Sequence, residues 1–298
     1  MGNSSAALLK DGKVIAAVEE ERLSRVKNDG SFPHLAISEV LSIANITLQD
    51  VNEIAIYWKP WRVLTRGLGT VKKLMGSTNS RKVVGHRIRE LFLDDEKNTN
   101  GSWSDLFRVK KILRARHGNF KCKVRFWDHH YTHQVYGEAM KDWKEYASLS
   151  YDGGGEEYST ILSIVKNGKR QVVTRHKWPN SLGHFYSTFT GFLGFEMLEG
   201  EYKMMGLAPY GDPKYKNIIL NKIIKLLPNG NYKLNTEFCD YHAALRGIFS
   251  SELIELLGDP RKDGYEPTKK HIDIACSVQS AFEETLIHIL HPVSIKFP

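Results

Sequence analysis

A strand–turn–strand pattern occurs twice in the sequence, and it limits the possible fold more than any other feature does. Residues 3–17 read NSSAALLKDGKVIAA and residues 159–173 read STILSIVKNGKRQVV, with Lys-Asp-Gly-Lys and Lys-Asn-Gly-Lys at the same offset. Asp-Gly or Asn-Gly between two apolar runs predicts a tight β-hairpin turn. Two such hairpins predict an α/β chain made of two similar lobes. A chance match of two turns is the alternative.

The two copies differ in what precedes them. An apolar run at residues 146–151 and an Asp-Gly-Gly-Gly turn lead into the second hairpin, whereas the first hairpin begins almost at Met1. We therefore expect the first lobe, residues 1–143, to lack its first strand. The second lobe is expected to span residues 144–298.

The candidate site lies in the segment 128–156, DHHYTHQVYGEAMKDWKEYASLSYDGGGE. His129 and His133 are four residues apart, so on a helix both imidazoles project from one face, which is a usual spacing for a shared divalent metal. Asp152, at the end of an apolar run, could supply an oxygen ligand. The alternative is a histidine pair on a solvated helix face.

Three glycines follow the aspartate. Gly153, Gly154 and Gly155 could expose backbone N–H groups to a phosphate. A glycine-rich turn after a strand is often only a turn. Because a metal beside a phosphate-binding turn makes a coherent nucleotide site, the combination favours nucleotide binding.

Periodicity and turn residues predict the other elements. We expect helices near residues 33–44, 82–92, 104–116, 182–189, 217–227 and 272–290, and strands near 54–58, 123–127 and 229–234. The charged segment 19–27 is interpreted as a solvated exit from the first hairpin. Residues 199–211 are expected to form a loop, either ligand-binding or on the surface with an internal ion pair. The last eight residues show no periodicity.

Composition narrows the class of protein. The net charge is +8, and the excess lies between Lys59 and Arg125, where Lys and Arg outnumber Asp and Glu by roughly three to one. That segment could bind along the phosphate backbone of a nucleic acid. A solvated helical face or a pocket for a small anion explains the excess of basic residues as well. Three widely spaced cysteines indicate a reducing compartment. Since no apolar run approaches a membrane span, we expect a cytoplasmic protein.

Five motifs together resemble one family, the NodU/CmcH-type O-carbamoyltransferases. They are SSAALLKDGKVIAAVEEERLSRVKNDGSFP, DHHYTH, DGGGE, SLGHFYSTFTGFLGF and EGEYKMMGLAPYG, in the order of the family. The resemblance implies a duplicated actin/sugar-kinase-like fold with ribonuclease-H-like lobes. It implies that a carbamoyl-adenylate, made from carbamoyl phosphate and ATP by a YrdC-like domain, passes its carbamoyl group to an acceptor hydroxyl.

The resemblance also implies roles for individual residues. His129, His133 and Asp152 match metal ligands, and the divalent metal would be iron. Gly153 to Gly155 would form a phosphate loop, with Asn3 and Ser4 as its counterpart in the first lobe. Lys27 matches a basic active-site position that could contact carbamoyl or phosphate oxygens. His130 and Tyr131 receive no role.

The sequence departs from the family pattern at both ends. Gly2 stands where the family has a histidine, and a fourth ligand, an aspartate, is expected beyond residue 298. The second lobe is therefore expected to be incomplete, the YrdC-like domain absent, and the chain inactive alone. A tRNA-modifying ATPase of the threonylcarbamoyladenosine type and a non-catalytic nucleotide-binding remnant are the alternatives. Nucleic acid is the less favoured partner.

Overall fold

A computed structural model describes residues 3–62, 105–140, 142–245 and 247–295. These residues belong to two compact units that divide between Trp127 and Asp128. The expected helix at residues 82–92 lies outside the described residues. The actin-like architecture and the lobe boundary after residue 143 stay predictions.

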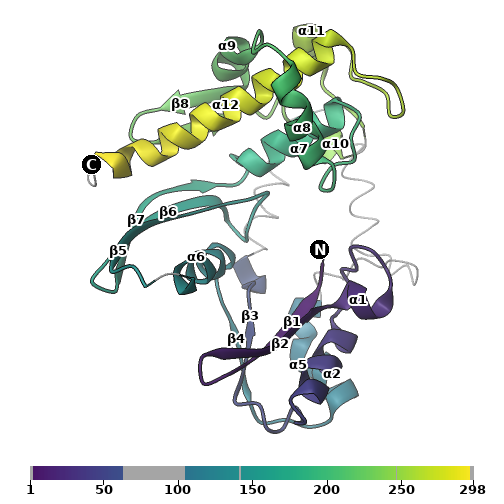
Figure 1. The fold of residues 1–298 in the computed structure, drawn as a ribbon, viewed down its shortest axis with the longest axis vertical. Coiled ribbons are helices and arrows are strands. Elements are labelled where there is room, and N and C mark those ends of the chain that lie inside the picture. Colours follow the sequence, from purple (N-terminus) through teal and green to yellow (C-terminus); the bar gives the residue numbers. More distant parts are fainter. Residues whose placement is uncertain (1–2, 63–104, 141, 246, 296–298) are drawn as a thin grey trace. The chain divides into compact units, whose positions relative to one another are not determined.

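In its described residues, the first unit contains a hairpin, a parallel strand pair and the helices α1, α2 and α5 (Figure 1). Its elements are β1 (Ser5–Lys10), β2 (Lys13–Glu19), α1 (Glu20–Ser24), α2 (His34–Ile43), β3 (Glu53–Ile56), α5 (Asp105–His117) and β4 (Lys123–Phe126).

The first predicted hairpin is confirmed. β1 and β2 are antiparallel, and the turn residues Asp11 and Gly12 have φ angles of 52° and 76°. Positive φ at both positions is what a tight hairpin turn requires, and it explains the Asp-Gly pair. β3 and β4 form a separate parallel pair. A small apolar core lies between α2, α5 and these strands, formed by Leu41, Leu48, Val109, Leu113 and Phe120.

The interpretation of residues 19–27 as a solvated exit is wrong for Glu20. Its side chain is 3% exposed, and its two carboxylate oxygens accept hydrogen bonds from the backbone N–H groups of Leu35 at 3.0 Å and Ala36 at 2.7 Å. These are among the first N–H groups of α2, which have no partner within the helix. Glu20 thus caps α2 from 15 residues away.

The second unit is larger and contains the second hairpin. Its elements are α6 (His129–Ala139), β5 (Glu145–Tyr151), β6 (Tyr158–Lys166), β7 (Lys169–Lys177), α7 (Leu182–Phe192), α8 (Glu201–Leu207), η1 (Ala208–Tyr210), α9 (Lys216–Ile218), η2 (Ile219–Ile223), β8 (Ile224–Leu227), β9 (Asn231–Leu234), α10 (Tyr241–Ala244), α11 (Ser251–Leu257) and α12 (Lys269–Ser294).

A three-stranded antiparallel sheet in the order β5-β6-β7 organises this unit. The predicted hairpin is confirmed as β6 and β7, and the predicted strand before it as β5. α6 covers one face of the sheet and α12 the other (Figure 1). On the α12 side, Leu162 and Ile164 of β6 join an apolar core with Phe185 and Phe189 of α7.

Two predictions for the second unit are wrong. Residues 217–227 were predicted as one helix, but only α9 and η2 are helical, and β8 follows. Ile224 begins β8, and Asn229 and Gly230, with φ angles of 60° and 71°, turn the chain into β9. The strand forms because this turn lets Ile224 pair with Leu234, and tertiary pairing overrides local helix periodicity.

The second wrong prediction concerns residues 199–211, where no helix was expected. Residues 199–211 form α8 and η1 rather than a loop, because Glu201 accepts hydrogen bonds from the Ser187 hydroxyl and the Leu198 N–H and so fixes the first turn of α8. The helix predicted near residues 272–290 is confirmed as α12, which begins at Lys269 and continues through Pro292 to Ser294. Val293 is buried there, and this burial stabilises the last turn despite the proline.

Candidate metal centre

The N-terminus of α6 positions the two predicted histidine ligands. Asp128 is the N-cap of the helix, and its Oδ1 accepts a hydrogen bond from the Tyr131 N–H at 3.2 Å. This cap starts the helix at His129. His129 and His133 therefore lie one turn apart on the same face of α6, as their spacing predicted.

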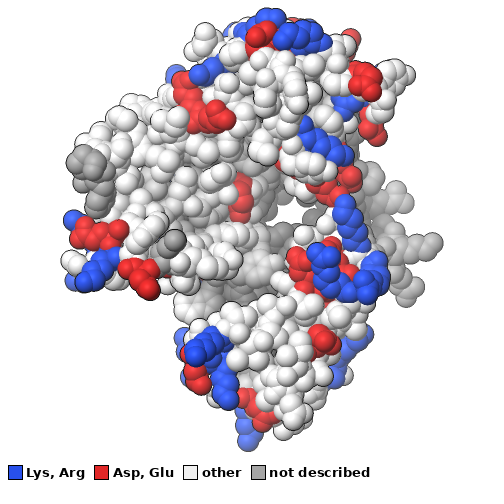
Figure 2. Space-filling view, in the orientation of Figure 1, with Lys and Arg blue, Asp and Glu red and all other residues white. Residues whose placement is uncertain are grey.

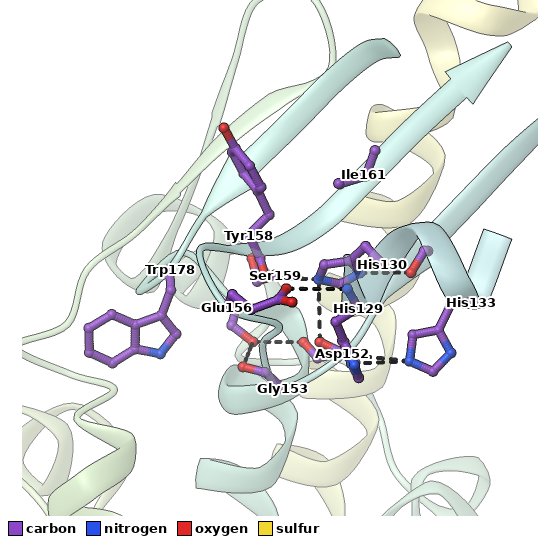
Figure 3. A network of polar contacts seen from close by, with 12 residues as sticks. His129, His130, His133, Asp152, Gly153, Glu156, Tyr158, Ser159, Ile161 and Trp178 are labelled. Atoms are coloured by element: carbon purple, nitrogen blue, oxygen red, sulfur yellow. Dashed lines mark hydrogen bonds and ion pairs between the residues drawn. The ribbon is translucent and has the colours of Figure 1, made fainter. Parts of the chain in front are cut away.

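The structure brings His129, His133 and Asp152 together (Figure 3). The Nε2 of His129 lies 2.6 Å from Oδ2 of Asp152 and 3.1 Å from Nε2 of His133, and the third side of the triangle is 3.6 Å. Metal bonds of about 2.0–2.2 Å place neighbouring ligand atoms about 3 Å apart. A single divalent ion therefore fits the three atoms.

The charge of Asp152 suits this role. Burial raises its pKa, but hydrogen bonds from His129 and His133, together with the nearby histidine charges, lower the pKa more, so it lies well below the ordinary value. Asp152 is thus a carboxylate at neutral pH. Its Oδ1 is buried, and no residue in the described part of the chain donates a hydrogen bond to it. An ionised, incompletely satisfied carboxylate between two imidazoles is a suitable cation ligand.

His130, to which the sequence assigned no role, fastens the helix to the sheet. Its Nε2 lies 2.8 Å from the carbonyl oxygen of Tyr158, and its Nδ1 lies 2.7 Å from the Ser150 hydroxyl. Because a carbonyl only accepts, Nε2 carries the proton and Nδ1 accepts from Ser150. Burial lowers the pKa of His130. Both nitrogens of this neutral ring are therefore used within the protein.

The glycine turn lies against the histidines. A Cβ on Gly155 would stand 3.1 Å from Cδ2 of His130 and 3.2 Å from Cδ2 of His129, so a side chain there would crowd both rings. Gly154 has a φ of 150°, which favours glycine. The N–H of Gly155 donates to the Tyr158 carbonyl at 2.8 Å. The phosphate-binding role of Gly153 to Gly155 stays a prediction.

Three further residues support the centre, and sequence reasoning missed them. Glu156 is 2% exposed and accepts the N–H of His129 at 3.2 Å. The Ser181 hydroxyl lies 2.9 Å from the Asp152 carbonyl and 3.0 Å from the Gly153 carbonyl, and it accepts the His184 N–H as N-cap of α7. Gly183 lies so close to this turn that a Cβ would stand 2.5 Å from the Gly153 nitrogen. Ser181 stands directly before an amphipathic run, and this pattern is the sequence signal that could have identified it as an N-cap.

The remaining predicted site residues lie in the first unit. The Ser4 N–H donates to the Asp29 carbonyl, and the Ser4 carbonyl accepts from the Glu20 N–H. Asn3 has a φ of 55°, and Lys27 follows α1. The predicted roles of Asn3, Ser4 and Lys27 stay predictions.

The basic segment is only partly described, because residues 63–104 lie outside the described chain. On the face drawn in Figure 2, the described Lys and Arg residues are interspersed with Asp and Glu. Among the helices of the described ranges, none is long and apolar enough to cross a membrane.

Comparison with known proteins relates the whole chain to one family. A family model described as the carbamoyltransferase N-terminus matches residues 1–297. The uncharacterised protein sll1178 of Synechocystis is 34% identical over 299 residues, which cover 96% of this chain and 46% of that protein. The nodulation protein NolNO of Sinorhizobium fredii is 28% identical over 290 residues, 97% of this chain and 38% of that protein.

A further relative is the nodulation protein NolO of Bradyrhizobium diazoefficiens. It is 31% identical over 163 residues, which cover 55% of this chain and 28% of that protein. The chain thus spans less than half the length of each of these three relatives.

Proposed function

The chain belongs to the carbamoyltransferase N-terminus family, which confirms the resemblance drawn from its motifs, and from this membership we propose a specific reaction. In this reaction a carbamoyl group passes from carbamoyl-adenylate to a hydroxyl of a metabolite or sugar. The carbamoyl-adenylate is itself formed from carbamoyl phosphate and ATP. The new bond joins the acceptor oxygen to the carbamoyl carbon, the bond between that carbon and the phosphate oxygen breaks, and AMP and a proton are released. A YrdC-like domain or partner supplies the adenylate.

The convergence of His129, His133 and Asp152 carries this proposal. A divalent ion bound there, which we take to be iron, supplies Lewis-acid charge that attracts nucleotide phosphates. The chain's contribution is a ligand set of two imidazole nitrogens and one ionised carboxylate. Such a set suits Fe²⁺, Zn²⁺ and Mn²⁺ alike, so the choice of iron rests on the family resemblance.

Other residues receive proposed roles around the nucleotide. The turn Gly153 to Gly155 adjoins Asp152, and we assign it to the phosphates. Asn3 and Ser4 form the corresponding segment of the first unit. The Lys27 ammonium is assigned to the carbamoyl or phosphate oxygens, because a fixed cation stabilises charge that develops there.

Nucleotide binding tests the site directly. ATP would be titrated calorimetrically into the chain with Mn²⁺ or Fe²⁺ present and again after chelation. We expect saturable binding that requires the metal and disappears in Asp152→Asn. ATP affinity that is unchanged by chelation and by Asp152→Asn would remove the metal from the proposed site.

Transfer is tested separately. The chain would be mixed with radiolabelled carbamoyl phosphate, ATP, a YrdC-like domain and a panel of sugars and aminoglycosides. A labelled acceptor formed by the wild-type chain and not by Asp152→Asn supports the reaction. If a characterised carbamoyltransferase labels its acceptor under the same conditions while this chain labels none, the proposal fails for that acceptor panel.

A further inference from the structure

α6 contacts its sheet with polar residues. His130, Gln134 and Glu138 follow one another at intervals of four, so they share one face of the helix. His130 is 1% and Gln134 3% exposed, whereas the apolar Tyr136 is 68% exposed. A helix on a sheet ordinarily buries its apolar side chains and exposes its polar ones. α6 does the reverse.

The sheet face beneath α6 carries buried polar side chains as well. Ser150 of β5 and Ser163 of β6 direct their hydroxyls to α6, while Leu149 and Leu162, one position away, join the apolar core on the α12 side. Alternation along each strand separates the two faces. We call this polar contact the α6 seam; its members are His130, Gln134, Glu138, Ser150, Ser163 and Arg170.

Gln134 lies at the centre of the α6 seam. Its amide nitrogen donates to the carbonyl of Ser148 in β5 at 3.0 Å and to the carbonyl of Ile161 in β6 at 3.0 Å. Its amide oxygen accepts from the Ser163 hydroxyl at 3.2 Å and from the Arg170 guanidinium in β7 at 2.7 Å. Both donors and both acceptor positions of the amide are used, and the partners come from all three strands.

Arg170 extends the seam to the end of the helix. Its guanidinium lies 2.5 Å from both carboxylate oxygens of Glu138, and it stands 5.2 Å from the centre of the Tyr131 ring. One residue of β7 therefore contacts three turns of α6, at Tyr131, Gln134 and Glu138. Charge-assisted, two-pronged contacts of this kind are directional.

The α6 seam bears on the candidate metal site because each histidine ligand lies directly before a residue of the seam. His129 is next to His130, and His133 is next to Gln134. At a side-chain radius of about 6 Å, a helix rotation of about 20° moves an atom by about 2 Å, which equals a whole metal–ligand bond. Apolar packing is non-directional, whereas two hydrogen bonds to strand carbonyls and two to side chains of the strands are directional and resist such a rotation.

We propose that Gln134 is a positioning residue that fixes the rotation of α6 so that His129 and His133 meet Asp152. This inference rests on the proposed function only in taking the three residues as metal ligands. The imidazole rings of His129 and His133 can be observed in solution without any metal, so their convergence on Asp152 need not be inferred from metal affinity. It can therefore be measured apart from metal binding.

The test replaces Gln134 by methionine, which keeps the length of the side chain and removes its hydrogen bonds. Gln279→Met is the matched control: Gln279 lies on α12 in the same unit, is half-buried and is hydrogen-bonded to Tyr186. Two readouts apply to each folded variant. One is the affinity and visible spectrum of bound Co²⁺, and the other is the imidazole ¹⁵N–¹H spectrum of the metal-free protein.

We expect Gln134→Met to bind Co²⁺ about 10–100-fold more weakly, the loss that is typical when a residue that orients the ligands from outside the metal site is removed. The Co²⁺ spectrum and the ring signals of His129 and His133 should change as well. Gln279→Met should match the wild type in all three. If Gln134→Met does not fold, Ser163→Ala, which removes one hydrogen bond to the Gln134 amide oxygen, should give smaller changes in the same direction.

The outcomes separate the two proposals. A folded Gln134→Met whose Co²⁺ affinity and imidazole signals equal those of the control overturns the positioning role. A wild type that takes up no Co²⁺, while the imidazole signals still move in Gln134→Met, rejects the metal centre and supports the positioning role. A merely structural role would lower stability and leave the spectra of the folded protein unchanged.

Discussion

The Nε2 atom of His129 lies 2.6 Å from Oδ2 of Asp152, although 23 positions separate the two residues. This distance is at the short end for a hydrogen bond between nitrogen and oxygen. His133 directs its Nε2 to the same carboxylate oxygen from 3.6 Å. Two imidazoles directed at one ionised oxygen form an arrangement that a shared cation would stabilise.

The first prediction concerns His133, the most exposed of the three. Its side chain is 54% exposed, so His133→Ala should change the free energy of unfolding of the metal-free protein by less than about 1 kcal/mol. Divalent-metal affinity should fall by about 100-fold, because one of the three proposed protein ligands is gone. Equilibrium dialysis with Zn²⁺ measures this. The exposed His291→Ala is the control, and equal affinity in both variants would contradict the prediction.

The second prediction concerns pH. Burial raises the pKa of folded Asp152, but hydrogen bonds from His129 and His133, together with the nearby histidine charges, lower it more, so the pKa lies below its ordinary value. A depressed pKa contributes stability that is fully present above about pH 4 and is lost as the pH falls toward the folded pKa. Urea unfolding in chelator, from pH 6 to pH 3, should show this loss. Asp152→Asn should flatten that part of the profile, and an unchanged slope would refute the assignment.

Local chemistry explains which parts of the fold were predicted. Asp11-Gly12 and Asn167-Gly168 adopt positive φ angles in two hairpins, and that requirement is visible in the residues themselves. The spacing of His129 and His133 likewise reports a helix face. Ile224 was misassigned because its pairing with Leu234 is made across a turn, and no local pattern contains it.

The supporting residues of the site were not predicted, for a related reason. Gln134, Ser150 and Glu156 are polar residues whose partners lie in other elements, and only the assembled unit shows them buried. A signal was present. Serines alternate with Leu149 before Asp152, and polar residues recur every four positions along α6. Read together, the two patterns indicate facing polar surfaces.

The third prediction concerns the cap formed by Glu20. Its buried carboxylate accepts two backbone N–H groups of α2. Glu20→Ala leaves these groups without an acceptor and should lower the free energy of unfolding of the first unit by about 2–3 kcal/mol. Urea unfolding followed by circular dichroism measures the change.

Its matched control is one residue away. Glu19 pairs with Arg22 on the surface at 3.4 Å, with side chains 43% and 71% exposed. Such pairs contribute about 0–1 kcal/mol, so Glu19→Ala should be nearly neutral. An equal decrease in the free energy of unfolding in the two variants would show that Glu20 acts only through its charge.

The last prediction concerns two helical glycines whose surroundings differ. A Cβ on Gly183 of α7 would stand 2.5 Å from the Gly153 nitrogen and 2.6 Å from the Asp152 carbonyl carbon, whereas a Cβ on Gly206 of α8 would meet nothing within 4 Å. Gly206→Ala should therefore stabilise the protein by about 0.5–1 kcal/mol, the usual gain when alanine replaces glycine in a helix. Gly183→Ala must instead move α7 or the backbone that carries Asp152. We expect it to destabilise by about 1–3 kcal/mol and to weaken Co²⁺ binding, because the carboxylate shifts against His129 and His133.

Chemical denaturation and Co²⁺ titration of both variants decide the matter. A Gly183→Ala protein as stable as Gly206→Ala and with wild-type Co²⁺ affinity would mean that the close approach of α7 does not hold Asp152 in place.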